Sequence, residues 1–165
     1  MPSKIWTIEN KKEEMVLRKK IPPLNFASEN KKELRGLVKQ MRIAMKENSG
    51  VGLSANQIGM PKRIFVAQVP DENGRPKFYA VLNPEIIKIS AKKIANEEGC
   101  LSVPLTTTGI VERPEQITLQ GLNLLGKKIK IKAWGLLARV FQHEVDHLNG
   151  MLFLDRTKQL KKYDA

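Results

Sequence analysis

Hydrophobic positions with helical spacing occur over residues 30–48, NKKELRGLVKQMRIAMKEN, where lysines and glutamates fill most of the other positions. The hydrophobic residues that recur three or four positions apart are Leu34, Leu37, Val38, Met41 and Met45. This pattern predicts an amphipathic helix with one buried face. In the next stretch, SGVGLSANQIGMP, several glycines and Pro61 end the periodicity, which predicts an irregular segment.

The middle of the chain alternates with the two-residue period of β-strands. Two runs rich in β-branched and aromatic residues, 63–69 and 78–89, flank an Asn-Gly pair that is typical of a tight turn between strands. Residues 110–122 and 127–134 continue in the same way, with isoleucines alternating with lysines in KIKIK. We therefore expect a β-hairpin followed by more antiparallel sheet.

The period changes again after Trp134. Leu136, Val140, His143 and His147 recur at helical spacing and align on one face. Gly150 suits the left-handed position that closes a helix, MLFLDR returns to an extended apolar pattern, and residues 157–165 form a short polar tail. These elements predict an α+β fold with antiparallel β-sheets around a central helix, in a single domain over residues 1–165.

Composition indicates which surfaces the protein can bind and which cellular compartment suits it. The chain has 29 Lys and Arg against 17 Asp and Glu, a net charge of +12 that favours polyanionic surfaces such as RNA or the ribosome, although dispersed lysines also simply keep a protein soluble. Its single cysteine excludes an intramolecular disulfide and suits a reducing compartment. The N-terminal residues contain no apolar run long enough for a signal peptide or a membrane span, so we expect a cytoplasmic protein.

Both histidines of the chain lie in His143-Glu144-Val145-Asp146-His147, an H-E-x-x-H pattern. On a helix, imidazoles four residues apart point the same way and can share a metal ion, and the adjacent glutamate can reach the water that the ion activates. The alternative is a helix whose histidines only pack or cap locally. Asp146 is either a partner for a neighbouring group such as Arg113 or a solvated acid.

A catalytic metal needs a third protein ligand. Downstream of His147 the only acids are Asp155 and Asp164, so the third ligand is expected upstream, and Cys100 in EEGCLSVP is the outstanding candidate. The alternative is an inert buried cysteine. One Cys and two His suit Fe(II), Zn, Ni or Co, and sequence does not select among them.

Three segments resemble the motifs of the peptide deformylase family: GVGLSANQ at 50–57, EGCLS at 98–102 and QHEVDHLNG at 142–150. The resemblance covers nearly the whole chain. It implies a hydrolase that removes the formyl group from nascent peptides beginning with N-formylmethionine and releases formate. It also implies an Fe(II) ion held by Cys100, His143 and His147, with Glu144 as general acid and base.

The resemblance also implies roles around the substrate. The Gln57 side chain and the Leu101 backbone amide would polarise the formyl oxygen, and the Gly52 backbone would align the peptide. Residues such as Val51, Leu53, Val103, Val140 and Phe141 are more often plain core, but by resemblance part of this set, with Val51, Val103 and Val140 as our candidates, lines the cavity for the methionine side chain. Two departures are Ser54, where alanine is common, and a longer segment after Pro104.

As partners we expect the formylated peptides and, through charge, transient contact with the ribosome; we expect a monomer. Two rival functions remain. A metalloprotease shares the H-E-x-x-H chemistry but predicts a downstream third ligand, which this chain lacks. A non-enzymatic RNA-binding module predicts aromatics interleaved with basic residues, and the few aromatics here cluster with none of the basic runs.

Overall fold

The amphipathic segment forms α2 (Lys31–Glu47) in a computed structural model that describes residues 3–164. Asn30 caps its N-terminus, since its side chain accepts hydrogen bonds from the backbone amides of Lys32 and Glu33. The buried face holds all five hydrophobic positions predicted for it and also Ala44. α2 packs with this face against β1 and β2, so the predicted helix is confirmed.

Within residues 3–164, eight strands form two antiparallel sheets. They are β1 (Gly52–Ser54), β2 (Ile64–Pro70), β3 (Pro76–Ile89), β4 (Lys93–Glu98), β5 (Thr107–Pro114), β6 (Gln116–Leu122), β7 (Lys128–Trp134) and β8 (Gln159–Lys162). One sheet has five strands in the order β1-β2-β3-β6-β7, and the other has three in the order β4-β5-β8. The hairpin predicted around Asn73 is β2–β3, whose turn places Gly74 at φ +75°.

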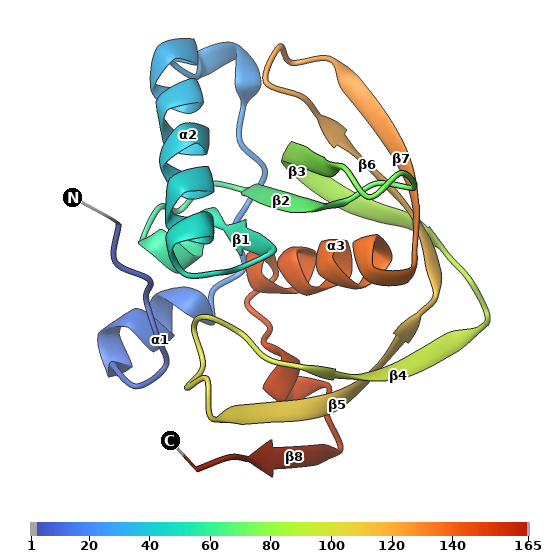
Figure 1. The fold of residues 1–165 in the computed structure, drawn as a ribbon. Coiled ribbons are helices and arrows are strands. Elements are labelled where there is room, and N and C mark those ends of the chain that lie inside the picture. Colours follow the sequence, from blue (N-terminus) through green and yellow to red (C-terminus); the bar gives the residue numbers. More distant parts are fainter. Residues whose placement is uncertain (1–2, 165) are drawn as a thin grey trace.

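α3 (Gly135–Leu148) carries the H-E-x-x-H residues and lies between the two sheets (Figure 1). Its Phe141 packs against Phe65 of β2 and Tyr79 of β3, with ring centroids 5.3 and 5.2 Å apart. Gly150 follows the helix at φ +76°, as expected, and a Cβ there would lie 2.4 Å from the Arg18 carbonyl oxygen. The sheets therefore enclose the helix that carries the H-E-x-x-H residues, and the α+β prediction is confirmed.

The short elements differ most from the predictions. The sequence pattern missed α1 (Lys11–Leu17), β4 and β8, the 3₁₀ turn η1 (Phe26–Ser28), and both β1 and the 3₁₀ turn η2 (Ala55–Ile58) within the stretch predicted to be irregular. The extended segment expected after Gly150 contains another 3₁₀ turn, η3 (Phe153–Asp155), and the polar tail forms β8, which pairs with β5. Residues 110–122, expected to be continuous sheet, divide at Glu115 between the two sheets.

None of the helices within residues 3–164 combines the length and the apolar character that crossing a membrane requires.

Candidate active site

Three ligand atoms converge between the sheets. Cys100 lies two residues after the end of β4, and α3 presents His143 and His147 one turn apart. The Cys100 Sγ lies 3.2 Å from His147 Nε2, which in turn lies 3.1 Å from His143 Nε2. All three ligand atoms lie within 4.8 Å of one another. The fold thus brings together residues that are more than forty positions apart in the sequence.

This cluster fits a divalent metal ion. Ligand bonds of about 2.0 Å to nitrogen and about 2.3 Å to sulfur place tetrahedral ligand atoms roughly 3.3–3.6 Å apart, close to the separations seen between these atoms. Burial alone would lower the pKa of His143, but Cys100, Glu98 and Glu144 raise it well above its ordinary value. Burial and the charge of His143 lower the pKa of His147 well below its ordinary value, which keeps that imidazole neutral, the form that binds a metal ion.

Glu98, the last residue of β4, orients one of the histidines. Its Oε1 lies 3.0 Å from His143 Nδ1, which leaves Nε2 facing Cys100 and His147. Arg113 of β5 donates two hydrogen bonds to the same carboxylate, and Arg139 of α3 donates another. Although burial would raise it, Arg113 and His143 hold the pKa of Glu98 well below its ordinary value.

Asp146 also belongs to this charged network. It is buried, and its carboxylate accepts hydrogen bonds from Arg113 at 2.9 Å and from Arg156 at 2.6 and 2.7 Å. Of the two interpretations of Asp146, the partner of Arg113 is confirmed and the solvated acid is wrong. Arg113 therefore links Glu98, whose carboxylate contacts His143, to Asp146 of α3.

Glu144 stands beside the ligand cluster with a free carboxyl oxygen. Only 3% of the residue is exposed, and its Oε2 has no hydrogen-bond partner within residues 3–164. Burial raises the pKa of Glu144 to about 7, in the range in which a carboxyl group can both take and give a proton at neutral pH. β1 passes so close that a Cβ at Gly52 would lie 2.5 Å from Glu144 Oε1.

Gln57 of η2 faces the cluster from the opposite side. Its Oε1 accepts hydrogen bonds from the backbone and the hydroxyl of Ser54 at 2.9 and 3.0 Å. Its Nε2 lies 3.0 Å from Ser102 Oγ and 3.7 Å from Cys100 Sγ. With the oxygen held by Ser54, the amide NH₂ group is directed toward the metal ligands.

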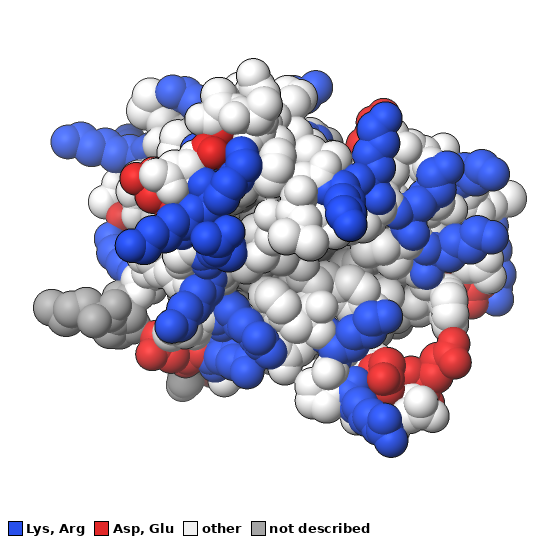
Figure 2. All heavy atoms as spheres, turned by 90° about the horizontal axis from the view of Figure 1, so that it is seen from above, with Lys and Arg blue, Asp and Glu red and all other residues white. Residues whose placement is uncertain are grey.

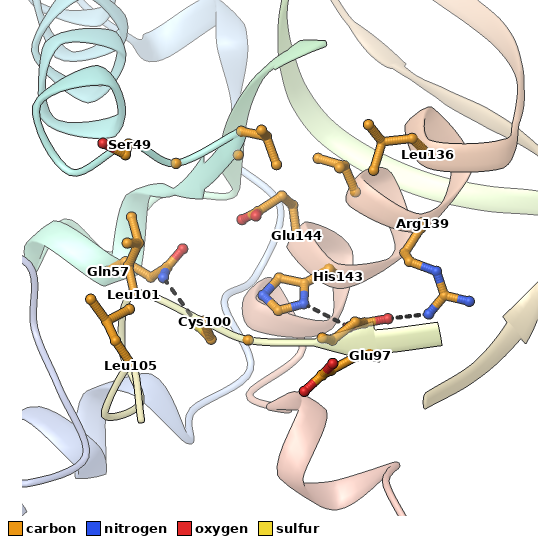
Figure 3. A pocket seen from close by; sticks show the side chains of 16 residues that line it. Ser49, Gln57, Glu97, Cys100, Leu101, Leu105, Leu136, Arg139, His143 and Glu144 are labelled. Carbon is orange, nitrogen blue, oxygen red and sulfur yellow. Dashed lines mark hydrogen bonds and ion pairs between the residues drawn. The ribbon is translucent and has the colours of Figure 1, made fainter. Parts of the chain in front are cut away.

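These groups open onto a cavity of about 310 Å³ (Figure 3). Figure 3 shows Gln57, Cys100, His143 and Glu144 arranged around it. The candidates Val51, Gly52, Leu101 and Val140 are among its lining residues. Val103 is not among them: it is 2% exposed and packs in one cluster with Cys100, Val111, Leu152 and Phe153, and its place at the methionine side chain stays a prediction.

Comparison with known proteins identifies the family. The family model for polypeptide deformylase matches residues 2–163. The peptide deformylase of Halothermothrix orenii is 45% identical over 145 residues, which cover 88% of this chain and 89% of that protein. The chain belongs to the peptide deformylase family.

Solved peptide deformylases share the fold. The crystal structure of the Thermotoga maritima protein matches with a TM-score of 0.82 at 36% identity, over 96% of this chain and 99% of that one. The Met-Ala-Ser-bound structure of a class I type b peptide deformylase from Acinetobacter baumannii matches with a TM-score of 0.82 at 33% identity, over 92% and 96% of the two chains.

The activity follows from membership of the peptide deformylase family. The chain is a hydrolase that removes the formyl group from the N-terminal formylmethionine of newly synthesised polypeptides and releases formate. The family and the Cys-His-His cluster together indicate a single metal ion. Neither the metalloprotease nor the non-enzymatic RNA-binding module accounts for this match.

The sequence patterns missed the groups that orient the site. Ser102 and Asn56 are buried beside it, and Asn56 Nδ2 donates to the His147 carbonyl oxygen at 2.8 Å. Arg139 reaches Glu98 from α3. The only signal in the sequence was the position of each residue in or beside a motif, because a hydrogen bond across 91 positions leaves no periodic pattern.

Proposed function

We propose that Cys100, His143 and His147 hold the one metal ion of this deformylase and that Glu144 transfers the protons of the reaction. The observation that carries this proposal is the convergence of the three ligand atoms within 4.8 Å, with Cys100 and His143 lining the same cavity as Glu144 and Gln57. The site residues come from η2, the segment after β4 and α3, so the complete fold is needed to assemble them.

The metal ion, when bound, supplies a Lewis acid that lowers the pKa of water and polarises the formyl group. We propose Fe(II) as the physiological ion, with Zn, Ni or Co able to occupy the same ligands, because a thiolate with two imidazoles suits all four. The buried carboxylate of Glu98 contributes by fixing His143 in the orientation that keeps Nε2 available.

Glu144 takes the proton of the attacking water as the water oxygen bonds to the formyl carbon. Its pKa of about 7 suits this step and the return step. In the return step, Glu144 gives the proton to the α-nitrogen of methionine as the bond between this nitrogen and the formyl carbon breaks. The products are formate and a free α-amine. Both steps need a carboxyl oxygen that is free to accept and release the proton. Glu144 Oε2 has no hydrogen-bond partner within residues 3–164, so it can do both.

Negative charge grows on the formyl oxygen during the attack. The Gln57 amide and the backbone N–H of Leu101 are the proposed donors to that oxygen, since both residues line the cavity next to Cys100. Preorganised donors of this kind stabilise a tetrahedral intermediate, and loss of one typically lowers the rate about a hundredfold or more. Ser54 prepares Gln57 for this role by binding its carbonyl oxygen.

The peptide is proposed to lie along β1. This strand is at the end of its sheet, so one of its edges is open to an additional strand, and Val51 and Gly52 line the cavity. Val140 would contact the methionine side chain. The structural neighbour from Acinetobacter baumannii was solved with Met-Ala-Ser bound, which supports a peptide of this type as the ligand.

We also propose the wider setting. Residues 1–165 form a single catalytic domain that acts as a monomer in the cytoplasm, where a reducing environment keeps the thiol of Cys100 available to the metal. Contact with the ribosome would be transient and assisted by the net charge of +12.

The test is formate release from formyl-Met-Ala-Ser by protein prepared anaerobically with Fe(II) or Ni(II). We expect release by the wild type, loss by at least a hundredfold in Glu144→Ala with metal still bound, and loss of both metal and activity in Cys100→Ser. Acetyl-Met-Ala-Ser serves as the control substrate. A Cys100→Ser variant that kept its metal and its activity would overturn the proposed ligand set.

A further inference from the structure

A ladder of lysines follows the edge strand β7. Lys128, Lys130 and Lys132 are all exposed, whereas the alternating Ile129, Ile131 and Ala133 face the core. Because a strand rises about 3.4 Å per residue, alternate lysines lie roughly 7 Å apart along one face. This separation is comparable to that of consecutive phosphates in an extended nucleic-acid strand.

The ladder continues across the sheet into a shallow hollow. Lys88 of β3 pairs in register with Thr118 of β6, which pairs with Lys132, so both lysines share one row of the outer face. Next to this row lies a hollow of about 400 Å³ whose lining includes Lys88, Lys132 and Trp134 and contains no carboxylate. Trp134 is 57% exposed, which is unusual for the largest apolar side chain.

These four lysines make no direct ion pair in the described part of the chain. Acids lie on neighbouring hollows: Glu85, to which Gln120 donates a hydrogen bond at 3.2 Å, shares one with Lys128 and Lys130. Asp71 and Glu72 share another with Lys132 and Trp134. Figure 2 shows basic side chains gathered over the β6–β7 side of the molecule and, separately, over α2.

The folded arrangement also changes an earlier expectation. On the sequence alone, the few aromatics cluster with none of the basic runs. In the fold, however, Trp134 lines the same hollow as Lys132 and Lys88. An exposed aromatic ring among lysines that make no ion pair is the combination that binds unpaired bases together with their phosphates. Lysines on an edge strand can alternatively serve only to prevent pairing with another sheet, which would not explain the exposed Trp134.

We propose that Lys88, Lys128, Lys130, Lys132 and Trp134 form a binding surface for single-stranded RNA. The lysines contact consecutive phosphates, and the indole of Trp134 stacks on an unpaired base. This inference assigns a surface to the proposed ribosome contact, and its biological meaning rests on that contact. Trp134 is followed two residues later by Leu136, which lines the catalytic cavity, so bound RNA would lie near the entrance for the nascent peptide.

The test is fluorescence anisotropy with a labelled twelve-nucleotide oligo-uridine, over a series of salt concentrations. The triple variant Lys128→Gln, Lys130→Gln, Lys132→Gln should raise Kd at least tenfold and reduce the slope of log Kd against log salt by about two. The matched control, Lys12→Gln, Lys20→Gln, Lys162→Gln, removes the same charge from exposed positions elsewhere and should change Kd by less than threefold.

The indole is tested separately. Trp134→Ala should weaken binding about tenfold with an unchanged salt slope, and Trp134→Phe should restore most of it. Equal loss in the two lysine variants, no effect of Trp134→Ala, or preference for an RNA duplex or for phosphatidylserine vesicles would each overturn the proposal. Formate release from a free peptide should stay at the wild-type level in all these variants, so failure of this surface and failure of the proposed catalytic residues give different results.

Discussion

Gly52 shows how a single residue without a side chain can position a catalytic group. Glu144 approaches the backbone of β1 so closely that a Cβ at Gly52 would lie 2.5 Å from Oε1. A contact this short forces either the strand or the carboxyl group to move. The glycine is therefore required by the position of Glu144 and not by the backbone conformation, since Gly52 is not among the glycines with positive φ.

We predict that Gly52→Ala lowers kcat of formate release at least tenfold, because the added methyl displaces Glu144. The matched control is Gly36→Ala, whose Cβ would meet nothing within 4 Å on the exposed face of α2. This control should keep full activity and gain up to about 1 kcal/mol in unfolding free energy, as glycine disfavours a helix. Full activity in Gly52→Ala would show that Glu144 does not need its observed position.

Sequence patterns identified the ligands better than the residues that orient them. His143, Glu144 and His147 were predictable because four-residue spacing on a helix has a direct geometric meaning. Cys100 was predictable only by elimination and by resemblance. Arg113 and Arg139 were not predictable as partners of Glu98, because these contacts depend on how β4, β5 and α3 pack together.

At the scale of elements, the short turn η2 directs an amide toward the metal ligands. Ser54 precedes this turn, and its backbone and hydroxyl both bind the Gln57 carbonyl oxygen. The hydroxyl also lies 2.8 Å from Asn56 Oδ1, and Asn56 in turn binds the backbone of His147. The serine thus connects the proposed oxyanion donor with the end of α3, which gives this departure from the common alanine a physical role.

We predict that Ser54→Ala lowers kcat about two- to tenfold with little change in KM, since one hydrogen bond is worth about 0.5–1.5 kcal/mol and the backbone amide still holds Gln57. Ser90→Ala removes a hydroxyl that only bridges Lys92 and Gln116, far along the chain from this turn, and provides the control. A lowered kcat in Ser90→Ala alone, or a change confined to KM in Ser54→Ala, would contradict this role for the turn.

Among the elements, length decided what could be predicted. α2, α3 and the β2–β3 hairpin each contain enough periods to show in the sequence, and all three formed. β8 spans only four residues, is polar, and exists because β5 offers it an edge, which no local pattern reveals. The division of residues 110–122 between two sheets was missed because no local pattern reveals which sheet a strand joins.

At the scale of the whole molecule, buried charges join the three-stranded sheet to the central helix. Glu98 of β4, Arg113 of β5 and Asp146 of α3 are all buried, and Arg113 bonds to both carboxylates. Such a network stabilises the fold only while each charge keeps its partner. The stability of the entire domain should therefore follow the ionisation of Glu98.

We predict that acid lowers the unfolding free energy of the wild type more than that of the Glu98→Gln variant. The pKa of Glu98 is depressed in the folded protein, so its contribution is fully present above the ordinary value of 4.5 and is lost as the pH falls from there toward the depressed value. Near pH 7, Glu98→Gln should cost about 3 kcal/mol in unfolding free energy, because Arg113 loses a charged partner.

Urea unfolding of metal-free protein between pH 7 and pH 3 would measure this difference. It should shrink as the pH falls. Glu112→Gln, at an exposed position next to Arg113 in β5, is the control and should show no comparable cost at pH 7. A difference that stayed constant over this range would mean that the charge of Glu98 does not stabilise the fold.

The most direct test of the central claim is a titration of metal-free protein with Ni(II), with bound metal and the rate of formate release from formyl-Met-Ala-Ser measured at each point. For the wild type, both should rise together and level off at one ion per chain, as expected for the single cluster of Cys100, His143 and His147. Glu144→Gln should bind the same single ion and release formate at least a hundredfold more slowly. Formate release by the metal-free protein, or wild-type release by Glu144→Gln, would contradict the account.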